Sequence, residues 1–235
     1  MLDIDDFRTM LDQVSPHIGT DDSTPALCGV RMEASNRGLL LVATDRFTLA
    51  MSRNPEPSTH PWATFLTAAD VKAYKALAVA SRTRAARIGM VEGALMISVG
   101  EHAMALPDRS GLAADFPGWR RIVRDAVEAA PNLTAPITLA PRLLARWHTH
   151  IPAWRTTHRG LTGTVPAGPD RGGALTVWSG GPNKPIVVAR GDHFLGVQMP
   201  MRHGDDHAGP VANVRDAWQH ALTEPSPSST IADAA

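Results

Sequence analysis

The stretch "PALCGVRMEASNRGLLLVATDRFTLAMSR" (25–53) contains three short apolar runs with turn signals at their boundaries. The turn "SNRG" joins "PALCGVRMEA" to "GLLLVATD", and its Asn and Gly are residues that hairpin turns prefer. "FTLAMSR" follows after one further turn. The stretch therefore predicts three consecutive antiparallel strands, which end before a proline-rich segment.

A helix is predicted immediately before this stretch. In "IDDFRTMLDQVSPHIG" (4–19), apolar residues recur at the spacing of one helical face, namely Phe7, Met10, Leu11 and Val14. Asp5 and Asp6 stand at its start, where negative charge favours the helix dipole. The unit thus consists of a helix followed by three strands.

The order of strand, helix and strands then recurs twice. "WATFL" (62–66) predicts a strand, and Thr67 with Asp70 predicts the cap of a helix whose apolar stripe is Val71, Tyr74, Leu77 and Ala78. The strands "ARIGMVEG", "ALMISVG" and "EHAMALPD" follow.

The third copy starts at "APITLAP" (135–141), where Pro141 suits a first helical turn. One face of its predicted helix would point inward; this face consists of Leu143, Leu144, Trp147 and Ile151. Four runs follow as strands: "GLTGTVPA", "GALTVWSG", "KPIVVARG" and "HFLGVQMP". Each copy leaves one sheet face half-buried and needs a neighbour, so three copies leave one without an internal partner.

Composition narrows the class of protein. The 235 residues are 43% apolar, enough for a sizeable core, and carry 23 basic and 23 acidic residues, so any DNA contact must come from a local patch. Cys28 is the single cysteine, which excludes an internal disulfide and fits a reducing compartment. The N-terminus is acidic and no apolar run approaches the length of a membrane span, so we expect a cytoplasmic protein without membrane contact.

Beyond Met201 the sequence changes character. "RHGDDHAG" reads as a polar linker and "PVANVRDAWQHALT" as a helix that carries Trp218, and the last residues have a disordered composition. We therefore predict a two-repeat domain at 1–123, a one-repeat half-domain at 134–202, and a linker, helix and tail at 203–235.

Three segments together resemble the bacterial DNA sliding clamp, the beta subunit of DNA polymerase III. They are residues 25–53, the segment "DFPGWRRIV" (115–123) and the segment "VQMPMR" (197–202). The resemblance implies an α+β fold of DNA-clamp type, no catalytic activity and no cofactor. It also implies a homo-oligomeric processivity factor for DNA replication.

The chain departs from the family pattern in several places. The family has six repeats where three are found here, and its Gly-His-Arg after "ATD" is replaced by Arg46, Phe47 and Thr48. Family chains are also usually acidic and usually stop at "MPMR". These differences suggest a reduced, divergent relative.

In the family, partner proteins such as polymerases and repair proteins insert a short peptide into a groove. By matching position, this groove would be lined by Leu27, Thr44, Arg46, Phe47, Leu49, Pro117, Ile122, Val197, Met199, Pro200, Met201 and Arg202. Methionine is unbranched and polarizable, so it repacks around different apolar anchors. Proline ends sheet pairing and would leave the last residues as a lip. The alternative is an ordinary edge strand with alternating methionines.

The family meets DNA through helices that contact phosphates without reading bases. The corresponding basic candidates are Lys72, Lys75, Arg82, Arg84, Arg87, Arg142, Arg146 and Arg155. An ordinary solvated basic face explains them equally well. The first helix opposes a uniformly basic lining, because it carries more acids than bases.

Three weaker signals point elsewhere. The histidines of "HTH" (148–150) and "HGDDH" (203–207) are metal-ligand types. However, Gly204 and the two acids of the second motif resemble a solvated linker, and no activated nucleophile or paired carboxylates converge elsewhere, so we expect no metal site and no enzyme. Cys28 lies in a predicted strand and is expected to be a small buried apolar side chain. A second function stays open: a regulatory or ligand-sensing module that keeps the fold without encircling DNA.

Overall fold

The structure of the chain is a computed structural model, which describes residues 2–58, 60–80, 85–132, 137–150 and 175–201. The first repeat begins with β1 (Leu2–Asp3) and α1 (Ile4–Val14), continued by the 3₁₀ turns η1 (Ser15–His17) and η2 (Pro25–Leu27). Its strands are β2 (Gly29–Ser35), β3 (Gly38–Thr44) and β4 (Thr48–Asn54). The three strands and the helix expected around residues 25–53 are confirmed.

The second repeat has the same order. It comprises β5 (Trp62–Thr67), α2 (Ala68–Ala80), β6 (Ala85–Val91), β7 (Ala94–Val99) and β8 (His102–Pro107). Two helices follow, α3 (Ser110–Ala114) and α4 (Trp119–Glu128). The third repeat contains α5 (Pro141–Leu144), η3 (Ala145–His150), β9 (Thr176–Ser179), β10 (Ile186–Arg190) and β11 (Phe194–Gln198).

The first two repeats complete each other by exchanging strands. β1 of the first repeat pairs with β6 of the second, and β5 of the second pairs with β2 of the first. The results are a four-stranded sheet in the order β1-β6-β7-β8 and a larger sheet that begins β5-β2-β3-β4. The expectation that one repeat needs a neighbour is therefore confirmed for this pair.

The third repeat adds its strands to the edge of the first. β11 pairs antiparallel with β4, and the larger sheet runs β5-β2-β3-β4-β11-β10-β9. This pairing answers the question raised by an odd number of repeats, because the third one extends an existing sheet. The predicted domains 1–123 and 134–202 consequently share one seven-stranded sheet.

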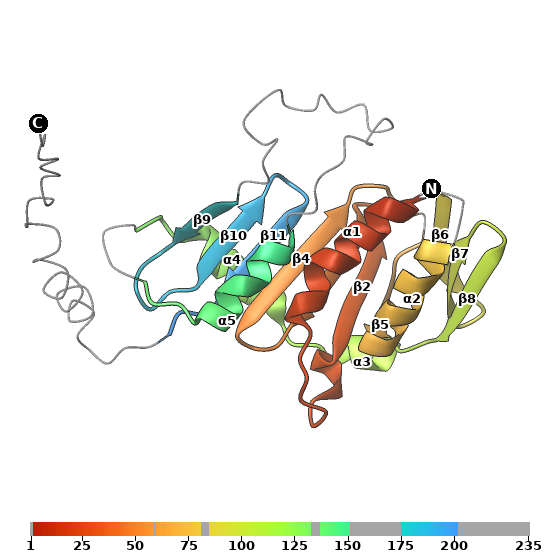
Figure 1. Cartoon of the computed structure of the whole chain (residues 1–235), viewed down its shortest axis with the longest axis horizontal. Coiled ribbons are helices and arrows are strands. Elements are labelled where there is room, and N and C mark those ends of the chain that lie inside the picture. The colour runs from red at the N-terminus through yellow and green to blue at the C-terminus, as the bar shows by residue number, and fades with distance from the viewer. Residues whose placement is uncertain (1, 59, 81–84, 133–136, 151–174, 202–235) are drawn as a thin grey trace, which may run out of the picture.

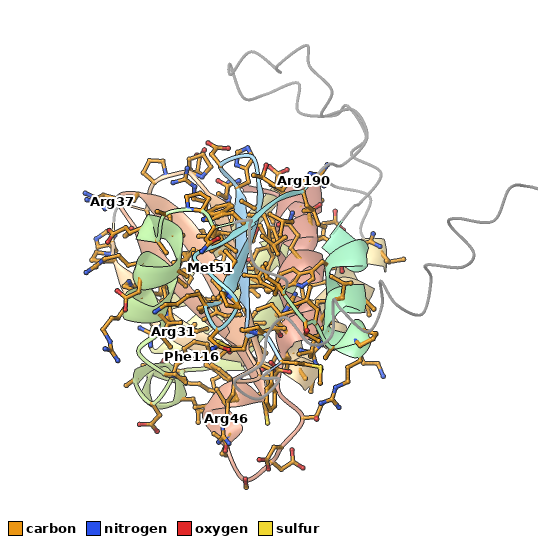
Figure 2. The ribbon with its side chains drawn as sticks, turned by 90° about the vertical axis from the view of Figure 1, so that its left-hand side faces the viewer. Arg31, Arg37, Arg46, Met51, Phe116 and Arg190 are labelled. Carbon is orange, nitrogen blue, oxygen red and sulfur yellow. The ribbon has the colours of Figure 1, made fainter. Side chains whose placement is uncertain are left out.

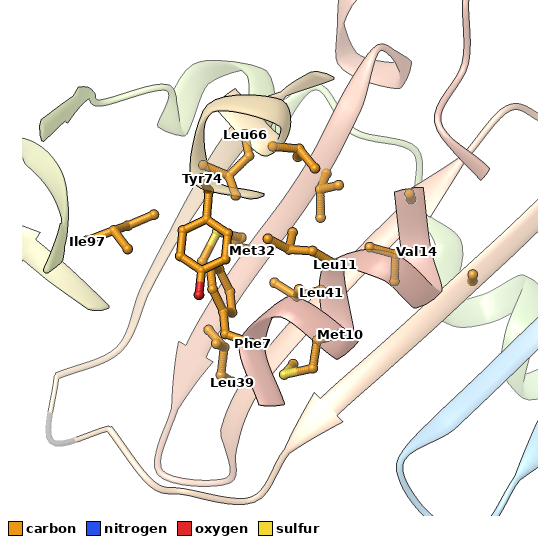
Figure 3. Packing of buried hydrophobic residues seen from close by; sticks show 14 of the residues in the cluster. Phe7, Met10, Leu11, Val14, Met32, Leu39, Leu41, Leu66, Tyr74 and Ile97 are labelled. Carbon is orange, nitrogen blue, oxygen red and sulfur yellow. The ribbon is translucent and has the colours of Figure 1, made fainter. Parts of the chain in front are cut away.

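The helices of the three repeats lie on one face of the sheets. Figure 1 shows α1, α2 and α5 in front of the strands and α4 behind β10. The core on the helix side, here called the helix-face core, is filled by α1 and α2 on the strands. Figure 3 shows its centre, where the Phe7 ring meets Tyr74 edge-on at 4.8 Å between ring centroids. Every residue of the predicted α1 stripe is buried there.

A second apolar cluster lies on the opposite face, under α3 and α4. We call it the outer-face cluster; its buried members are Val42, Leu49, Phe65, Ala113, Phe116, Trp119, Val123, Ala126, Val187 and Val197. Its members come from the first repeat, from β5 of the second, from the connecting helices and from the third repeat. The connection between the predicted domains is thus a packed helix pair.

The predicted cap of α2 is confirmed. The Thr67 N–H donates to Asp70 Oδ2 at 2.8 Å, and the Asp70 N–H donates to Thr67 Oγ1 at 3.2 Å. Arg109 Nη1 also donates to Asp70 Oδ2, at 2.7 Å, so the cap connects α2 to the segment after β8.

We expect Thr67→Ala to lower the free energy of unfolding by about 1 kcal/mol, since it removes one half of a capping box. Urea denaturation followed by circular dichroism measures the change. Thr20→Ala, in an exposed loop, is the control and is expected to change stability little. Equal values for the two variants would contradict this role of Thr67.

Six expectations about the third repeat, Cys28 and the C-terminal segment need correction or lie outside the described residues. Residues 137–140 form no strand, and in the strand-exchange scheme their partner would belong to a missing fourth repeat. Leu144 is exposed, because the helix there is only one turn before η3 tightens it. Cys28 precedes β2 and is half-buried instead of lying inside the strand. The strand at "GLTGTVPA", Ile151 and the helix with Trp218 lie outside the described residues.

Candidate functional site

The turn between β3 and β4 is held by one carboxylate. Asp45 Oδ1 accepts the N–H groups of Phe47 and Thr48 at 3.0 and 2.8 Å. The backbone of Arg46 has φ +76°, a left-handed conformation that non-glycine residues rarely adopt. The turn therefore projects Phe47 outward in a fixed direction.

β11 runs alongside the start of β4 and continues past it. Val197 faces Leu49 as its partner across the two strands, and Thr44 of β3 faces Leu49 from the other side. One residue beyond β11, the Met199 N–H donates to the Phe47 carbonyl at 2.9 Å. The first and third repeats thus meet at one end of the sheet.

Large apolar side chains stay exposed at this end. Phe47 is 54%, Met199 40% and Met201 48% exposed there, and Ile122 on α4 is 45% exposed. Met201 is anchored through its N–H, which donates to the Thr138 carbonyl at 2.9 Å. Exposed apolar side chains gathered at one place are typical of interaction sites.

The floor of this site is buried. Leu49 and Val197 are 7% and 3% exposed, and both belong to the outer-face cluster with Phe116, Trp119 and Val123. Figure 2 shows Phe116 and Arg46 at the same end of the molecule, with Arg37 and Arg190 at the opposite end. The connecting helices therefore pack over the sheet face that carries Leu49 and Val197.

The predicted groove residues fall into two groups in the structure. Leu27, Thr44, Leu49 and Val197 are buried, and Arg46, Phe47, Pro117, Ile122, Met199 and Met201 are exposed, with Pro200 between these classes. Arg202 lies outside the described residues. The sequence reasoning missed Phe116, Trp119 and Thr138. The spacing of Phe116, Trp119, Val123 and Ala126 was a helical signal that would have identified the first two.

An ion pair connects this end of the sheet to the helix face. Arg146 Nη1 donates to Asp45 Oδ2 at 2.6 Å and to Thr48 Oγ1 at 2.7 Å. Its side chain is 26% exposed. Arg146, a DNA-contact candidate, therefore has a structural role in holding the turn that presents Phe47.

A hollow of about 1010 Å³ opens on the helix face between the end of α1 and the start of α2. It brings three of the DNA-contact candidates together, namely Lys72, Lys75 and Arg146. Lys75 Nζ is already paired with Asp12 Oδ1 at 2.7 Å, whereas Lys72 is exposed. Arg142 is exposed on α5 and Arg87 on β6, and Arg82, Arg84 and Arg155 lie outside the described residues.

Cys28 lies at the edge of the same hollow. Its Sγ–H donates to the Asp21 carbonyl at 3.2 Å. Burial raises the pKa of the Cys28 thiol above its ordinary value, and the charges of Asp22 and Asp21 raise it further. The thiol form is favoured, which makes Cys28 a poor nucleophile.

We expect alkylation of Cys28 by iodoacetamide at pH 8 to be several-fold slower than that of a free cysteine peptide, because a raised pKa lowers the thiolate fraction. The rate should rise with pH up to a midpoint above that of the peptide. Mass spectrometry of quenched samples measures both rates. A midpoint below that of the peptide would show an activated thiol instead.

The described residues contain neither a metal-ligand cluster nor a membrane-spanning helix. In that part of the chain, no three His, Cys, Asp or Glu side chains come together as metal ligands. No described helix is long and apolar enough to cross a membrane. The histidine side chains of "HTH" and the whole of "HGDDH" lie outside this description.

The arrangement of the repeats identifies the fold class of the chain. Repeats of one helix and a set of strands, with the helices on one face of antiparallel sheets, form the DNA-clamp fold. Residues 1–106 match the family described as "DNA polymerase III beta subunit, central domain". This match covers the first two repeats and confirms the resemblance there.

Solved structures show the same fold over most of the chain. The beta subunit of DNA polymerase III from Thermotoga maritima has a TM-score of 0.63 at 13% identity, over 86% of this chain and 65% of that one. The beta subunit from Streptococcus pyogenes has a TM-score of 0.59 at 11% identity, over 94% and 72%. The Pseudomonas aeruginosa sliding clamp bound to griselimycin has a TM-score of 0.55 at 16% identity, over 83% and 63%. This chain thus spans 65% of the length of the Thermotoga protein.

Proposed function

We propose that this chain is a non-catalytic, sliding-clamp-like protein of the cytoplasm that binds peptide segments of replication or repair proteins. The binding site is the groove at the end of the seven-stranded sheet, between the turn at Phe47, the segment after β11 and the helices α3 and α4. The family match over residues 1–106 and the fold support this assignment.

The observation that carries the proposal is the junction of β4 and β11. It buries Leu49 against Val197 and leaves Phe47, Met199 and Met201 exposed beside them. An apolar floor next to adaptable apolar side chains suits the insertion of apolar side chains from a peptide. A ligand is already known for one relative, because the Pseudomonas aeruginosa clamp is described bound to griselimycin.

We expect Met201→Ala and Met199→Ala each to weaken peptide binding about tenfold, because each removes an apolar contact that peptide binding would bury. Fluorescence anisotropy of the full chain with a fluorescein-labelled clamp-binding peptide measures the affinities, with unlabelled griselimycin as competitor. Met96→Ala is the matched control. Met96 is half-buried in β7, on the other sheet.

The outcome for the wild type decides the proposal. Displaceable binding that falls in both groove variants and persists in Met96→Ala supports it. If the wild-type chain does not bind the peptide, or if Met96→Ala weakens binding as much as the groove variants do, the groove is not a peptide site.

DNA contact is the second part of the proposal. The helix face would meet the phosphate backbone non-specifically through Lys72 and Arg142, which are exposed on α2 and α5. Binding of this kind weakens as salt rises, by an amount set by the number of phosphates neutralised. We propose that a homo-oligomer completes the enclosure of DNA, since the chain carries three repeats and the family ring twelve.

A regulatory module without DNA encirclement is the second candidate function. Its support is the pairing of Lys75 with Asp12 and of Arg146 with Asp45, which removes two cations from phosphate binding. The mass in solution by light scattering separates the two candidates. A stable monomer of about 25.1 kDa would favour the module, and a defined oligomer the clamp.

A further inference from the structure

β9 is the last strand of the seven-stranded sheet, and no described strand pairs with its outer edge (Figure 1). Ser179 closes one end of this edge, because its carbonyl accepts the Asn132 N–H at 2.7 Å. Every second residue of a strand directs its backbone groups to the same side, so the N–H and C=O of Val177 face outward as well. The Val177 side chain is 53% exposed. An exposed apolar edge of this kind is a template for another strand.

The first two repeats show which strand would complete this edge. Each donates the strand before its helix to the first strand after the helix of the other repeat, so that β1 pairs with β6, and β5 with β2. The register is the same in both cases. The last residue before the helix pairs with the first residue of the receiving strand, as Asp3 does with Ala85. Thr67 pairs with Gly29 in the same way. β9 is the first described strand after the helices of the third repeat and is the equivalent receiving strand.

Residues 137–140 are the equivalent donor segment. They directly precede α5, as β1 precedes α1 and β5 precedes α2, but they form no strand. All three segments have a leucine two positions before the first helical residue, namely Leu2, Leu66 and Leu139. The backbone of Ala140 is extended, with φ −71° and ψ 121°. The segment therefore has the position of a donor strand, and no described strand receives it.

The third repeat holds this segment from one side. The Met201 N–H donates to the Thr138 carbonyl at 2.9 Å. The second repeat makes an equivalent contact, because the Arg109 N–H, two residues after β8, donates to Thr64 Oγ1 of the donor strand β5 at 3.3 Å. Since the Thr138 carbonyl points to Met201, an extended segment directs the backbone groups of Leu139 to the opposite side. That side is the one on which a receiving strand would lie.

The side chains of the two segments fit the same register. The exchange register places Leu139 opposite Val177, the second residue of β9. Leu139 and Leu175 pack against the helix-face core, whereas Trp178 packs against the outer-face cluster. Because side chains alternate between the two faces of a strand, Val177 points to the helix face with Leu175. Leu139 and Val177 therefore belong to the same face, as the side chains of directly paired residues must.

Leu144 is a second exposed apolar residue in this part of the molecule. It is the fourth residue of α5 and is 51% exposed. The fourth residues of α1 and α2 are Phe7 and Val71, and both are buried in the helix-face core that the first two repeats build together. The third repeat thus leaves a strand edge, a donor segment and an apolar helix position without the partner that the first two repeats provide for each other.

A second copy of this chain supplies all three complements at once. We propose that two copies form a two-fold symmetric dimer, in which residues 137–140 of each chain pair with the outer edge of β9 of the other. Leu139 then covers the partner's Val177, and the two α5 helices meet at Leu144. In a two-fold interface every contact is made twice, and exchange of an identical element is a low-cost route to a dimer. The inference rests on the homo-oligomer of the proposed function and specifies its interface, and it requires neither DNA nor a bound peptide.

Light scattering of the full chain tests the dimer. We expect a mass of about twice 25.1 kDa for the wild type and about 25.1 kDa for Val177→Lys, because a charge on the edge opposes strand addition. Val91→Lys is the matched control and should stay dimeric, since Val91 is 55% exposed at the end of β6 in the other sheet. Both valines are exposed, so both variants should fold, which circular dichroism checks.

Disulfide cross-linking tests the register. Leu139→Cys combined with Val177→Cys, in a Cys28→Ser background, places two thiols opposite each other across the dimer interface, within the reach of a disulfide. Mild oxidation should then give a covalent dimer on a non-reducing gel. Leu139→Cys combined with Ala103→Cys is the control and should give none, because Ala103 is exposed on β8, an edge of the other sheet.

Every outcome decides the inference. A wild-type dimer that Val177→Lys dissociates, together with the cross-link between positions 139 and 177, supports it. A wild-type oligomer in which either effect is absent overturns this interface and leaves the proposed homo-oligomer standing. A strand of the same chain on this edge, such as the one that the sequence predicts at "GLTGTVPA", would give that result. A wild-type monomer overturns both the interface and the homo-oligomer, and the peptide groove is then judged by its own experiment.

Discussion

Phe7→Ala is expected to lower the free energy of unfolding by about 3–5 kcal/mol, the range for truncating a buried aromatic residue. Phe7 is fully buried in the helix-face core and meets the Tyr74 ring edge-on, so the variant loses an aromatic contact and leaves a cavity between α1 and α2. Because α1 and α2 come from different repeats, the loss should affect both sheets together. Urea denaturation and thermal unfolding measure it.

Phe47→Ala is the matched control for this variant. Phe47 undergoes the same chemical change but is more than half exposed, so its truncation should alter stability by about 0.5 kcal/mol or less. The same variant should weaken peptide binding, which Phe7→Ala affects only through unfolding. Equal loss of stability in the two variants would contradict the assignment of Phe7 to the core.

Trp147→Ala is expected to have a comparable effect, about 3–5 kcal/mol, but centred on the third repeat and its contact with His17. Trp147 is 3% exposed and lies 4.5 Å from the His17 ring and 6.2 Å from Phe194, measured between ring centroids. It also packs over Gly196, where an added Cβ would come within 2.3 Å of its ring. Removing it deletes the contacts of η3 with Phe194 and Gly196 and leaves Gln198 without its buried donor.

Hydrogen exchange followed by mass spectrometry locates this loss. Amides of β9, β10 and β11 should exchange much faster in Trp147→Ala, and those of β6, β7 and β8 in the four-stranded sheet should keep their protection. Uniform loss of protection over both sheets would show that the third repeat is not an independent cooperative unit. Full protection in β11 would show that Trp147 does not hold it.

The sequence predicted the elements that local physics determines. The apolar stripe of α1, the capping box at Thr67 and the strand order of residues 25–53 each depend on neighbours within a few residues, and the structure has all three. Pro141 likewise opens α5 as expected. Where the apolar periodicity and the turn residues indicate the same element, few other local conformations compete with it.

The pairing of strands that are distant in the sequence could not be predicted from local patterns. No sequence pattern near Leu49 or Val197 indicates that β4 and β11 pair, because the two strands lie far apart in the chain. The missing strand at 137–140 is the same problem in reverse, since a β-type segment forms no strand where its partner repeat is absent. The exposure of Leu144 follows from the shortness of α5, which periodicity alone does not reveal.

The candidate site was predicted in part. The apolar residues at Phe47, Leu49, Val197 and Met199 do come together, as their hydrogen bonds and strand pairing show. The contact of the connecting helices with the sheet was not predicted, because packing between elements that are distant in sequence is a property of the folded structure. Whether these residues bind a peptide is the proposal that experiment must decide.

The methionines of the chain allow the most direct measurement of this proposal. Nine methionines give nine methyl signals when the full chain is labelled with ¹³C-methyl methionine, assigned by single Met→Leu variants. On titration with the clamp-binding peptide, we predict that the signals of Met199 and Met201 shift and those of Met10 and Met32, buried in the helix-face core, stay in place. Unchanged Met199 and Met201 signals at saturating peptide would contradict a groove at this end of the sheet.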